Sequence, residues 1–208
     1  MLFNSGREYS GLISCEEIGL YNPKTPLYFE SVLADTKNEN TFIGFEYTDD
    51  EALALLPPRR PDSNKGSFGK ILIVAGSKEI YGAVYMAAEA ALRTGAGLVR
   101  VVTDLRNRDV LSDKLPEAMI LTYETDDLEN ESVSSSNDEF IRSYQASIVW
   151  ADVVLAGPGL GTGKVGELLL DTLARNLSLG KYLVLDADAL NIISGNTSDW
   201  FSKFTSKV

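Results

Sequence analysis

The chain has 208 residues, of which 44% are hydrophobic and 24% are charged, with one cysteine and no histidine. The formal net charge of −11 repels nucleic acid and anionic membrane surfaces, so we expect neither as a partner. Without histidine, Ser-His-Asp and Cys-His nucleophiles and the common zinc sites are excluded, and one cysteine excludes an internal disulfide. No apolar run reaches the length of a membrane span or a signal peptide, which predicts a cytoplasmic protein.

The first part of the chain differs from the rest. Residues 1–36 contain strand-like pieces but no helix of their own, and a linker-like stretch follows. Regular organisation begins near Thr48, whose spacing to Glu51 predicts a capping box and a short helix that ends at Pro57. We therefore expect one domain over residues 45–208 and a separate segment over 1–36.

Strands and helices alternate along the rest of the chain. Apolar runs predict strands at 71–76, 98–103, 152–156 and 182–186, each followed by a helical stretch. The clearest helix follows Gly82, where small residues recur with helical spacing. The alternation predicts an α/β fold with a mainly parallel sheet flanked by helices. We predict a solvated surface loop for the acidic stretch 124–140, with a brief helix leading into Ile141.

The stretch ADVVLAGPGLGTGKVGE, residues 151–167, has four glycines before a lysine. It fails the Walker A pattern at Pro158 and Val165, and it fails the Gly-x-Gly-x-x-Gly pattern at Thr162 and Lys164. What remains is a strand, a flexible turn and a helix whose apolar face carries Val165, Leu168, Leu169, Thr172 and Leu173. Such a turn can present backbone N–H groups to an anion, or it can be a plain turn without a ligand.

Small or acidic residues follow three of the predicted strands. Because ligands bind at the carboxyl ends of parallel strands, these residues predict a nucleotide or phosphate site in which carboxylates hold a metal or a sugar hydroxyl. Plainer interpretations exist: Asp188 can be the N-cap of a helix that begins at Ala189, and Gly82 can simply end a turn. A basic cluster suits an anionic ligand or a solvated loop, and consists of Arg59, Arg60, Lys65 and Lys70.

Four ordered stretches resemble the N-terminal part of the ADP- or ATP-dependent NAD(P)HX dehydratases. They are NKGSFGKILIVAGSKEIYGAVYMAAEAALRTGAGLVRVVT, LPEAMI, ADVVLAGPGLGTG and LVLDADALN. The resemblance implies a ribokinase-like fold and a hydro-lyase that regenerates NADH or NADPH from (6S)-NADHX or NADPHX, with ADP or ATP and Mg²⁺ as cofactors. It also implies that Gly82, Ala83 and Gly159 lie against the hydrated cofactor. The position before Lys65 is commonly His in the family and is Asn64 here.

We assign the candidate site from these patterns and the resemblance together. The predicted substrate-binding residues are Gly82, Ala83, Gly159, Asp186, Asp188 and Asn191. The predicted phosphate or anion loop consists of Lys65, Gly66, Gly157 and Gly161. No metal ligand is assigned, although Asp186 and Asp188 are candidates for orienting a metal or a substrate hydroxyl. The catalytic residues are expected beyond Val208, because the family's Pro-His and Gly-x-Gly-Asp segments should follow Asn191.

Residues 2–22 are similar to the tail of an NAD(P)HX epimerase domain. We therefore interpret residues 1–36 as that tail and a linker, and residues 45–208 as the N-terminal part of a dehydratase domain whose C-terminal part is missing. Such a fragment is expected to be inactive alone. The mechanism implied for the complete enzyme is phosphoryl transfer to the C6 hydroxyl of the hydrated ring, followed by elimination of phosphate. The alternative functions left open are a ribokinase-like small-molecule kinase and a non-catalytic nucleotide-binding module. Assembly into a homo-oligomer is also left open.

Overall fold

The computed structural model describes residues 61–129 and 135–205. The chain divides into two compact units, Met1–Arg60 and Pro61–Val208, and all described residues belong to the second. The helix predicted near Thr48 and the segment predicted over residues 1–36 lie outside the described residues. No helix among the described residues is long and apolar enough to cross a membrane.

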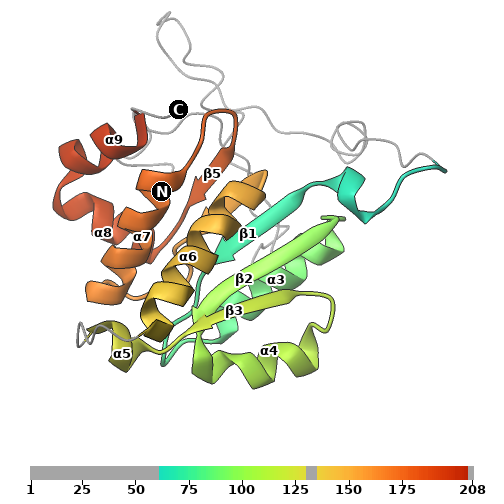
Figure 1. The fold of residues 1–208 in the computed structure, drawn as a ribbon, viewed down its shortest axis with the longest axis horizontal. Coiled ribbons are helices and arrows are strands. Elements are labelled where there is room, and N and C mark those ends of the chain that lie inside the picture. Colours follow the sequence, from blue (N-terminus) through green and yellow to red (C-terminus); the bar gives the residue numbers. More distant parts are fainter. Residues whose placement is uncertain (1–60, 130–134, 206–208) are drawn as a thin grey trace, which may run out of the picture. The chain divides into compact units, whose positions relative to one another are not determined.

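Five parallel strands form one sheet in the order β3-β2-β1-β4-β5. The elements in chain order are η2 (Lys65–Phe68), β1 (Lys70–Val74), α3 (Gly82–Arg93), β2 (Leu98–Asp104), η3 (Leu105–Asn107), α4 (Arg108–Lys114), β3 (Met119–Tyr123), α5 (Thr125–Glu129), α6 (Ser135–Trp150), β4 (Val153–Ala156), α7 (Lys164–Asn176), β5 (Tyr182–Leu185), α8 (Asp188–Gly195) and α9 (Thr197–Thr205). The α/β fold with a mainly parallel sheet is confirmed (Figure 1).

The central strand β1 is buried on both faces, as its continuous apolar sequence predicts. Leu72 and Val74 point to a core shared with α6, α7 and α8. Ile73 and Ala75, on the other face, pack with residues of α3 and α4. Figure 1 shows the same two helical layers, with α6 and α7 in front of the sheet and α3 behind it. The alternation of side chains along β1 therefore divides the core between the two layers.

The stretch 124–140, predicted as a surface loop with a brief helix leading into Ile141, contains α5 and the first six residues of α6. Helix α6 begins at Ser135, and its residues Phe140, Tyr144 and Ile148 are buried in the core. They recur every fourth residue and so share one face of the helix. The brief helix predicted before Ile141 is thus the start of a 16-residue helix, and the acidic and serine-rich composition of the stretch masked the core position Phe140. Strand β3 was not predicted either.

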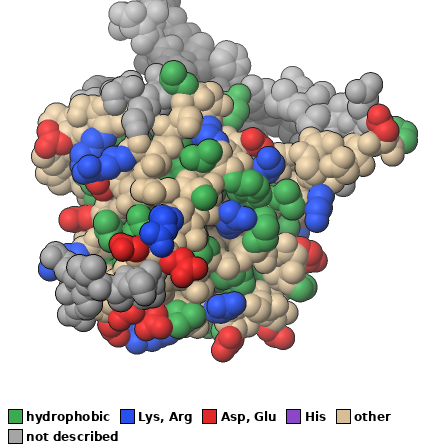
Figure 2. Space-filling model, in the orientation of Figure 1, with side chains coloured by type: hydrophobic (Ala, Val, Ile, Leu, Met, Phe, Trp, Pro, Cys, Tyr) green, Lys and Arg blue, Asp and Glu red, His purple; other side chains and the backbone are tan. Residues whose placement is uncertain are grey.

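Helix α7 buries a broader face than its sequence pattern predicts. Leu168, expected inside, is 38% exposed, whereas Leu170 and Ala174 are buried. The difference arises because α7 contacts α6, α8 and α9 as well as the sheet core. On the face shown in Figure 2, Lys and Arg side chains lie scattered among acidic and hydrophobic ones.

Asp171 of α7 forms an ion pair with Lys203 of α9 and so links the two helices. Its carboxylate accepts hydrogen bonds from Lys203 Nζ of α9 at 2.7 Å and from Arg175 Nε at 2.5 Å. Burial opposes ionisation of Asp171, but these hydrogen bonds outweigh it, so the pKa of Asp171 lies below its usual value. A carboxyl whose pKa falls on folding stabilises the fold above the unfolded-state pKa, and this contribution is lost as the pH falls through the folded-state pKa.

We predict that Asp171→Asn lowers the free energy of unfolding at pH 7 by about 1 kcal/mol, because it removes a charge shared by two cations. The difference between the two proteins should be complete above about pH 4, the unfolded-state pKa of Asp, and should shrink as the pH falls further. Urea unfolding across this pH range measures it. Glu89→Gln is the control, since the ion pair of Glu89 is made with Arg93, whose side chain is 79% exposed. A pH-independent difference would contradict the assignment.

Candidate functional site

The site lies where the order of strands reverses. From β1 the chain adds β2 and β3 on one side of the sheet, and then returns to add β4 and β5 on the other. Ligands bind at such a reversal, in the crevice outside the carboxyl ends of the two central strands. The loops that leave β1 and β4 are joined there by backbone hydrogen bonds, from Gly76 N to Pro158 O at 2.9 Å and from Gly157 N to Val74 O at 3.0 Å.

Gly157 allows the loop after β4 to lie directly on the turn after β5. A Cβ atom at Gly157 would lie 1.8 Å from the carbonyl oxygen of Asp186, and its φ of 126° disfavours any other residue. Asp186 N donates to Ala156 O at 3.1 Å and extends the pairing of β4 with β5 into the turn. The two loops are therefore in backbone contact with no side chain between them.

Asp188 fixes the middle of the glycine loop, residues 157–163. Its Oδ2 accepts a hydrogen bond from Gly161 N at 2.8 Å, and its Oδ1 accepts one from Asn191 Nδ2 at 3.3 Å. Asp188 is the first residue of α8, and Ala187 occupies the N-cap position. Ala187 has a φ of 46°, the one positive value outside glycine among the described residues. The plain interpretation of Asp188 as an N-cap is therefore wrong, because its carboxylate binds another loop.

The start of α3 meets the same loop from the other side. A Cβ at Gly159 would lie 2.6 Å from Ile80 Cγ2 and 3.2 Å from the Cβ of Ala83. Gly82 begins α3, and a Cβ built on it meets nothing within 4 Å. Tyr81 precedes the helix without capping it through its side chain and is 55% exposed. Open space thus adjoins the first turn of α3, beside Gly159.

Two buried polar side chains, Asn107 and Tyr123, donate hydrogen bonds to backbone carbonyls of the β1–α3 loop. Asn107 Nδ2 donates to Ser77 O at 3.1 Å and to Thr103 Oγ1 at 2.8 Å, and Asn107 is only 4% exposed. The hydroxyl of Tyr123 donates to Gly76 O at 3.4 Å. Burial raises the pKa of Tyr123 far above its usual value, so the phenol stays neutral and remains a donor. Sequence reasoning missed both residues, because neither belongs to a glycine or carboxylate motif.

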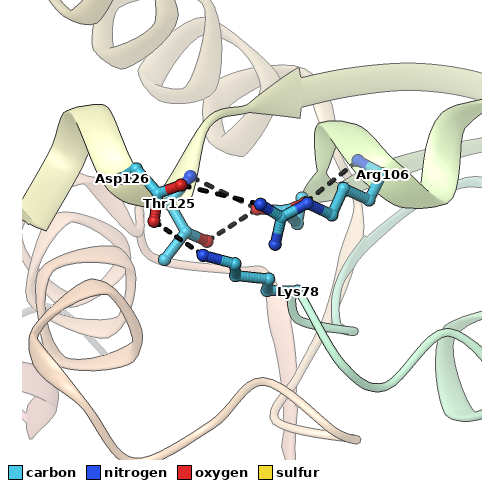
Figure 3. Close-up of polar contacts among 5 residues, drawn as sticks. Lys78, Arg106, Thr125 and Asp126 are labelled. Carbon is cyan, nitrogen blue, oxygen red and sulfur yellow. Dashed lines mark hydrogen bonds and ion pairs between the residues drawn. The ribbon is translucent and has the colours of Figure 1, made fainter.

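A second polar cluster joins the ends of β2 and β3 to the same loop (Figure 3). The buried carboxylate of Asp104 accepts from Arg106 N at 2.9 Å and from the hydroxyl of Thr125 at 2.6 Å. Above it, Asp126 accepts from Lys78 Nζ at 2.8 Å and lies 3.6 Å from the guanidinium of Arg106. The hydrogen bond from Lys78 holds the pKa of Asp126 below its usual value. These contacts restrain the β1–α3 loop at its outer side.

The structure gathers the predicted substrate-binding residues at this edge of the sheet. Gly82, Ala83 and Gly159 adjoin one another, Asp188 contacts Asn191, and the backbone of Asp186 lies against Gly157.

Lys65 and Gly66 lie at the opposite edge. Their helix η2 precedes β1, and Gly97 and Leu98 at the start of β2 donate to Phe68 O and Gly69 O. Figure 1 shows η2 at the beginning of β1, away from the β1–α3 loop. A single anion loop containing both Lys65 and Gly161 is therefore not formed within this chain.

The three predicted anion-binding glycines also use their N–H groups internally. Gly66 N donates to the side chain of Asn64, which caps η2, while Gly157 N and Gly161 N donate to Val74 O and Asp188. In this conformation none of the three N–H groups points to a ligand. Close packing at Gly157 and a left-handed backbone at Gly157 and Gly161 are sufficient reasons for glycine at these two positions, and the phosphate loop stays a prediction.

The described residues provide no ready metal centre. Among residues 61–129 and 135–205, no group of three or more His, Cys, Asp or Glu side chains could hold a metal ion. Asp188, one of the two candidate ligands, already accepts two hydrogen bonds. Mg²⁺ takes an octahedral shell of oxygens that usually includes waters and substrate phosphates beside one or two carboxylates, so Asp188 would supply at most part of such a shell.

Comparison with known proteins now identifies the family. The family model described as NAD(P)H-hydrate dehydratase matches residues 71–208. The chain belongs to this family. The family resemblance read from the sequence is confirmed.

Curated relatives include single and bifunctional enzymes. The chain is 34% identical to an ADP-dependent (S)-NAD(P)H-hydrate dehydratase of Listeria monocytogenes, over 67% of this chain and 45% of the relative. It is 39% identical to the bifunctional NAD(P)H-hydrate repair enzyme of Escherichia coli, over 68% of this chain and 24% of the relative. A Coxiella burnetii bifunctional enzyme is 35% identical over 88% of this chain and 36% of the relative. The chain thus spans less than half the length of each.

Solved structures agree on the fold. A ribokinase-like superfamily protein of Enterococcus faecalis has a TM-score of 0.58 at 24% identity, covering 72% of this chain and 52% of that one. A hypothetical protein of Streptococcus mutans has a TM-score of 0.57 at 27% identity, covering 72% and 53%. An ADP/ATP-dependent NAD(P)H-hydrate dehydratase of Bacillus subtilis, co-crystallised with ATP and Mg²⁺, has a TM-score of 0.51 at 24% identity, covering 69% and 46%. The ribokinase-like fold is confirmed.

The contact between Gly157 and Asp186 yields a stability prediction. Gly157→Ala should lower the free energy of unfolding by several kcal/mol, on the order of 3, because the new Cβ overlaps backbone and the residue must keep a positive φ. Gly163→Ala in the same loop should cost less than about 1 kcal/mol, since a Cβ there meets nothing within 4 Å. Thermal or urea unfolding of both variants tests this, and equal losses would show that the loops do not touch as described.

Proposed function

We propose that this chain forms the substrate side of an ADP- or ATP-dependent dehydratase that converts (6S)-NADHX or NADPHX to NADH or NADPH. The observation that carries the proposal is the meeting of Gly82 and Ala83, at the start of α3, with Gly159 of the glycine loop. All three side chains are absent or small, and open space adjoins Gly82. Family membership supports the reaction class, and the reversal of strand order at the carboxyl edge supports the location.

In this proposal the chain binds and orients the hydrated nicotinamide ring. A flat ring lies over Gly82 and Gly159 because neither residue has a side chain to obstruct it. The first N–H groups of α3 have no partners within the helix and can donate to polar groups of the ligand. Ile80, 45% exposed beside Gly159, covers one side of the ring and excludes water there. Phosphoryl transfer to the C6 hydroxyl replaces a poor leaving group, hydroxide, by a better one, phosphate. Holding the ring in one orientation then assists the elimination of phosphate.

The nucleotide side of the reaction is not built from the described residues. The described residues contain no group of three or more His, Cys, Asp or Glu side chains that could hold a metal ion, and the N–H groups of Gly157 and Gly161 are already donated within the protein. We propose that the residues for ADP or ATP and for catalysis come from the part of the enzyme that the longer relatives possess. We also propose that residues 1–36 contain the tail of an epimerase domain, because residues 2–22 are similar to one.

The 208-residue chain should bind NADPH yet convert (6S)-NADPHX slowly or not at all. The measurement pairs a fluorescence titration of the reduced nicotinamide with an assay of (6S)-NADPHX, ADP or ATP and MgCl₂. Absence of NADPH binding would contradict the proposal. A phosphorylated product formed without NADPH would instead indicate a small-molecule kinase.

Gly82→Leu should weaken NADPH binding at least about tenfold, roughly 1.4 kcal/mol, because the side chain fills the space beside Gly159. The melting temperature should stay the same or rise, since leucine is a better helix former than glycine. Gly195→Leu is the matched control: it also meets open space, but at the end of α8. Equal NADPH affinities for the two variants would show that the ligand does not lie at the start of α3.

A further inference from the structure

A carboxylate of the protein already binds the N–H group at the centre of the glycine loop. Gly161 N donates to the carboxylate of Asp188 at 2.8 Å, Gly157 N donates to Val74 O, and Leu160 N donates to Gly157 O at 3.0 Å. A phosphate-binding loop instead offers several N–H groups to the ligand. The loop of this chain therefore has its central donor paired with a carboxylate that carries the same sign of charge as a phosphate.

Packing explains two glycines of the loop and one glycine just after it. Gly157 admits the carbonyl of Asp186, and Gly159 admits Ile80 and Ala83. Gly166, in the first turn of α7, admits the carbonyl of Gly161, which would lie 2.2 Å from a Cβ there. These three glycines, and Gly161 with its φ of 81°, thus have a structural reason that requires no phosphate, whereas a Cβ at Gly163 would meet nothing within 4 Å.

Asp188 is held in this position by its surroundings. The preceding Ala187 has a φ of 46°, an unfavourable conformation for a residue with a Cβ, and it persists only where neighbouring contacts determine it. Asp188 itself is half-buried, and Asn191 donates to its other oxygen at 3.3 Å. A carboxylate can accept about four hydrogen bonds, and two are made here. Acceptor capacity remains for a neutral donor.

We propose that Asp188 is a specificity-determining residue: its carboxylate occupies the Gly161 N–H, keeps phosphate groups out of the glycine loop, and receives an uncharged hydrogen-bond donor of the ligand, a sugar hydroxyl or the carboxamide N–H. A phosphate brought beside Asp188 meets a like charge, whereas a neutral donor gains a charge-assisted hydrogen bond. The proposal rests on the proposed function, because Asp188 would orient the dinucleotide that the proposed function assigns to this site. Its nicotinamide and ribose face the glycine loop, and its pyrophosphate faces away.

The test compares inorganic phosphate with NADPH on the 208-residue chain and two variants. Asp188→Asn keeps an oxygen that accepts from Gly161 N but removes the charge, and Asp188→Ala removes both. The amide resonance of Gly161 reports binding in the loop, and the nicotinamide fluorescence reports NADPH. Asp199→Asn in α9 is the control for loss of one negative charge, since Asp199 bonds only with neutral groups of its own helix region, including Asn196.

We expect phosphate to leave the Gly161 amide unchanged in the wild type and in Asp199→Asn. In Asp188→Ala it should shift that amide, with a gain in phosphate affinity of at least about tenfold, the factor that corresponds to one like-charge contact near a protein surface. Asp188→Asn should show a smaller gain and keep its NADPH affinity within about threefold, the difference expected of one hydrogen bond that is weakened but not lost.

Two results would overturn the inference: a phosphate shift of Gly161 as large in the wild type as in Asp188→Ala, or no shift in either. If Asp188→Ala does not fold, the Asp188→Asn protein decides, and an unchanged phosphate affinity there overturns the inference. Failure of the wild type to bind NADPH, with the phosphate results as expected, would overturn the proposed function and leave the role of Asp188 intact.

Discussion

The site depends on one close backbone contact, that of Gly157 with the carbonyl of Asp186. It brings the loop after β4 onto the turn after β5 at the point where the sheet reverses its strand order. From this contact follow the position of Asp188 beside Gly161 and the approach of Gly159 to the start of α3. A side chain at Gly157 would separate the two loops and so remove the relation between α3, the glycine loop and α8.

The two edges of the sheet are stabilised by different means. At the carboxyl edge, buried neutral donors such as Asn107 and Tyr123 hold the carbonyls of the β1–α3 loop. At the amino edge, Arg100 lies 4.6 Å from the ring of Trp150, and Lys181 donates to Val149 O and Ala151 O. Arg100 and Lys181, at the amino edge, therefore stabilise contacts within the fold. At the carboxyl edge, open space adjoins Gly82 at the start of α3.

The sequence was sufficient to predict the class of the fold and the edge of the sheet at which Gly82, Gly159 and Asp188 lie. Strand β1 is apolar after Lys70 because both of its faces are buried, and the helix after Gly82 shows its period in small residues, so both elements could be predicted. The class of the fold and the family are confirmed. The location of Gly82, Gly159 and Asp188 at one edge followed from the rule for parallel sheets.

The sequence was not sufficient where long-range contacts decide the role of a residue. Asp188 looked like a helix cap, but its partner lies 27 positions away in another loop. Asn107 holds Ser77, 30 positions distant, and no local pattern marks it. Lys65 looked like an anion ligand because of its charge and its glycine neighbour, yet η2 lies at the other end of β1. Composition and spacing carry no information about such pairings.

The measurement that tests the central claim most directly is a map of backbone amide shifts of the isotope-labelled chain during titration with NADPH. We predict that the perturbed amides cluster at the start of α3, in the glycine loop and at the start of α8, with Gly82, Ala83 and Gly159 among the largest. The amides of Lys65, Gly66 and Gly97, at the amino edge, should not move. Perturbations centred on η2 and the start of β2 would contradict the account and place the ligand at the opposite edge of the sheet.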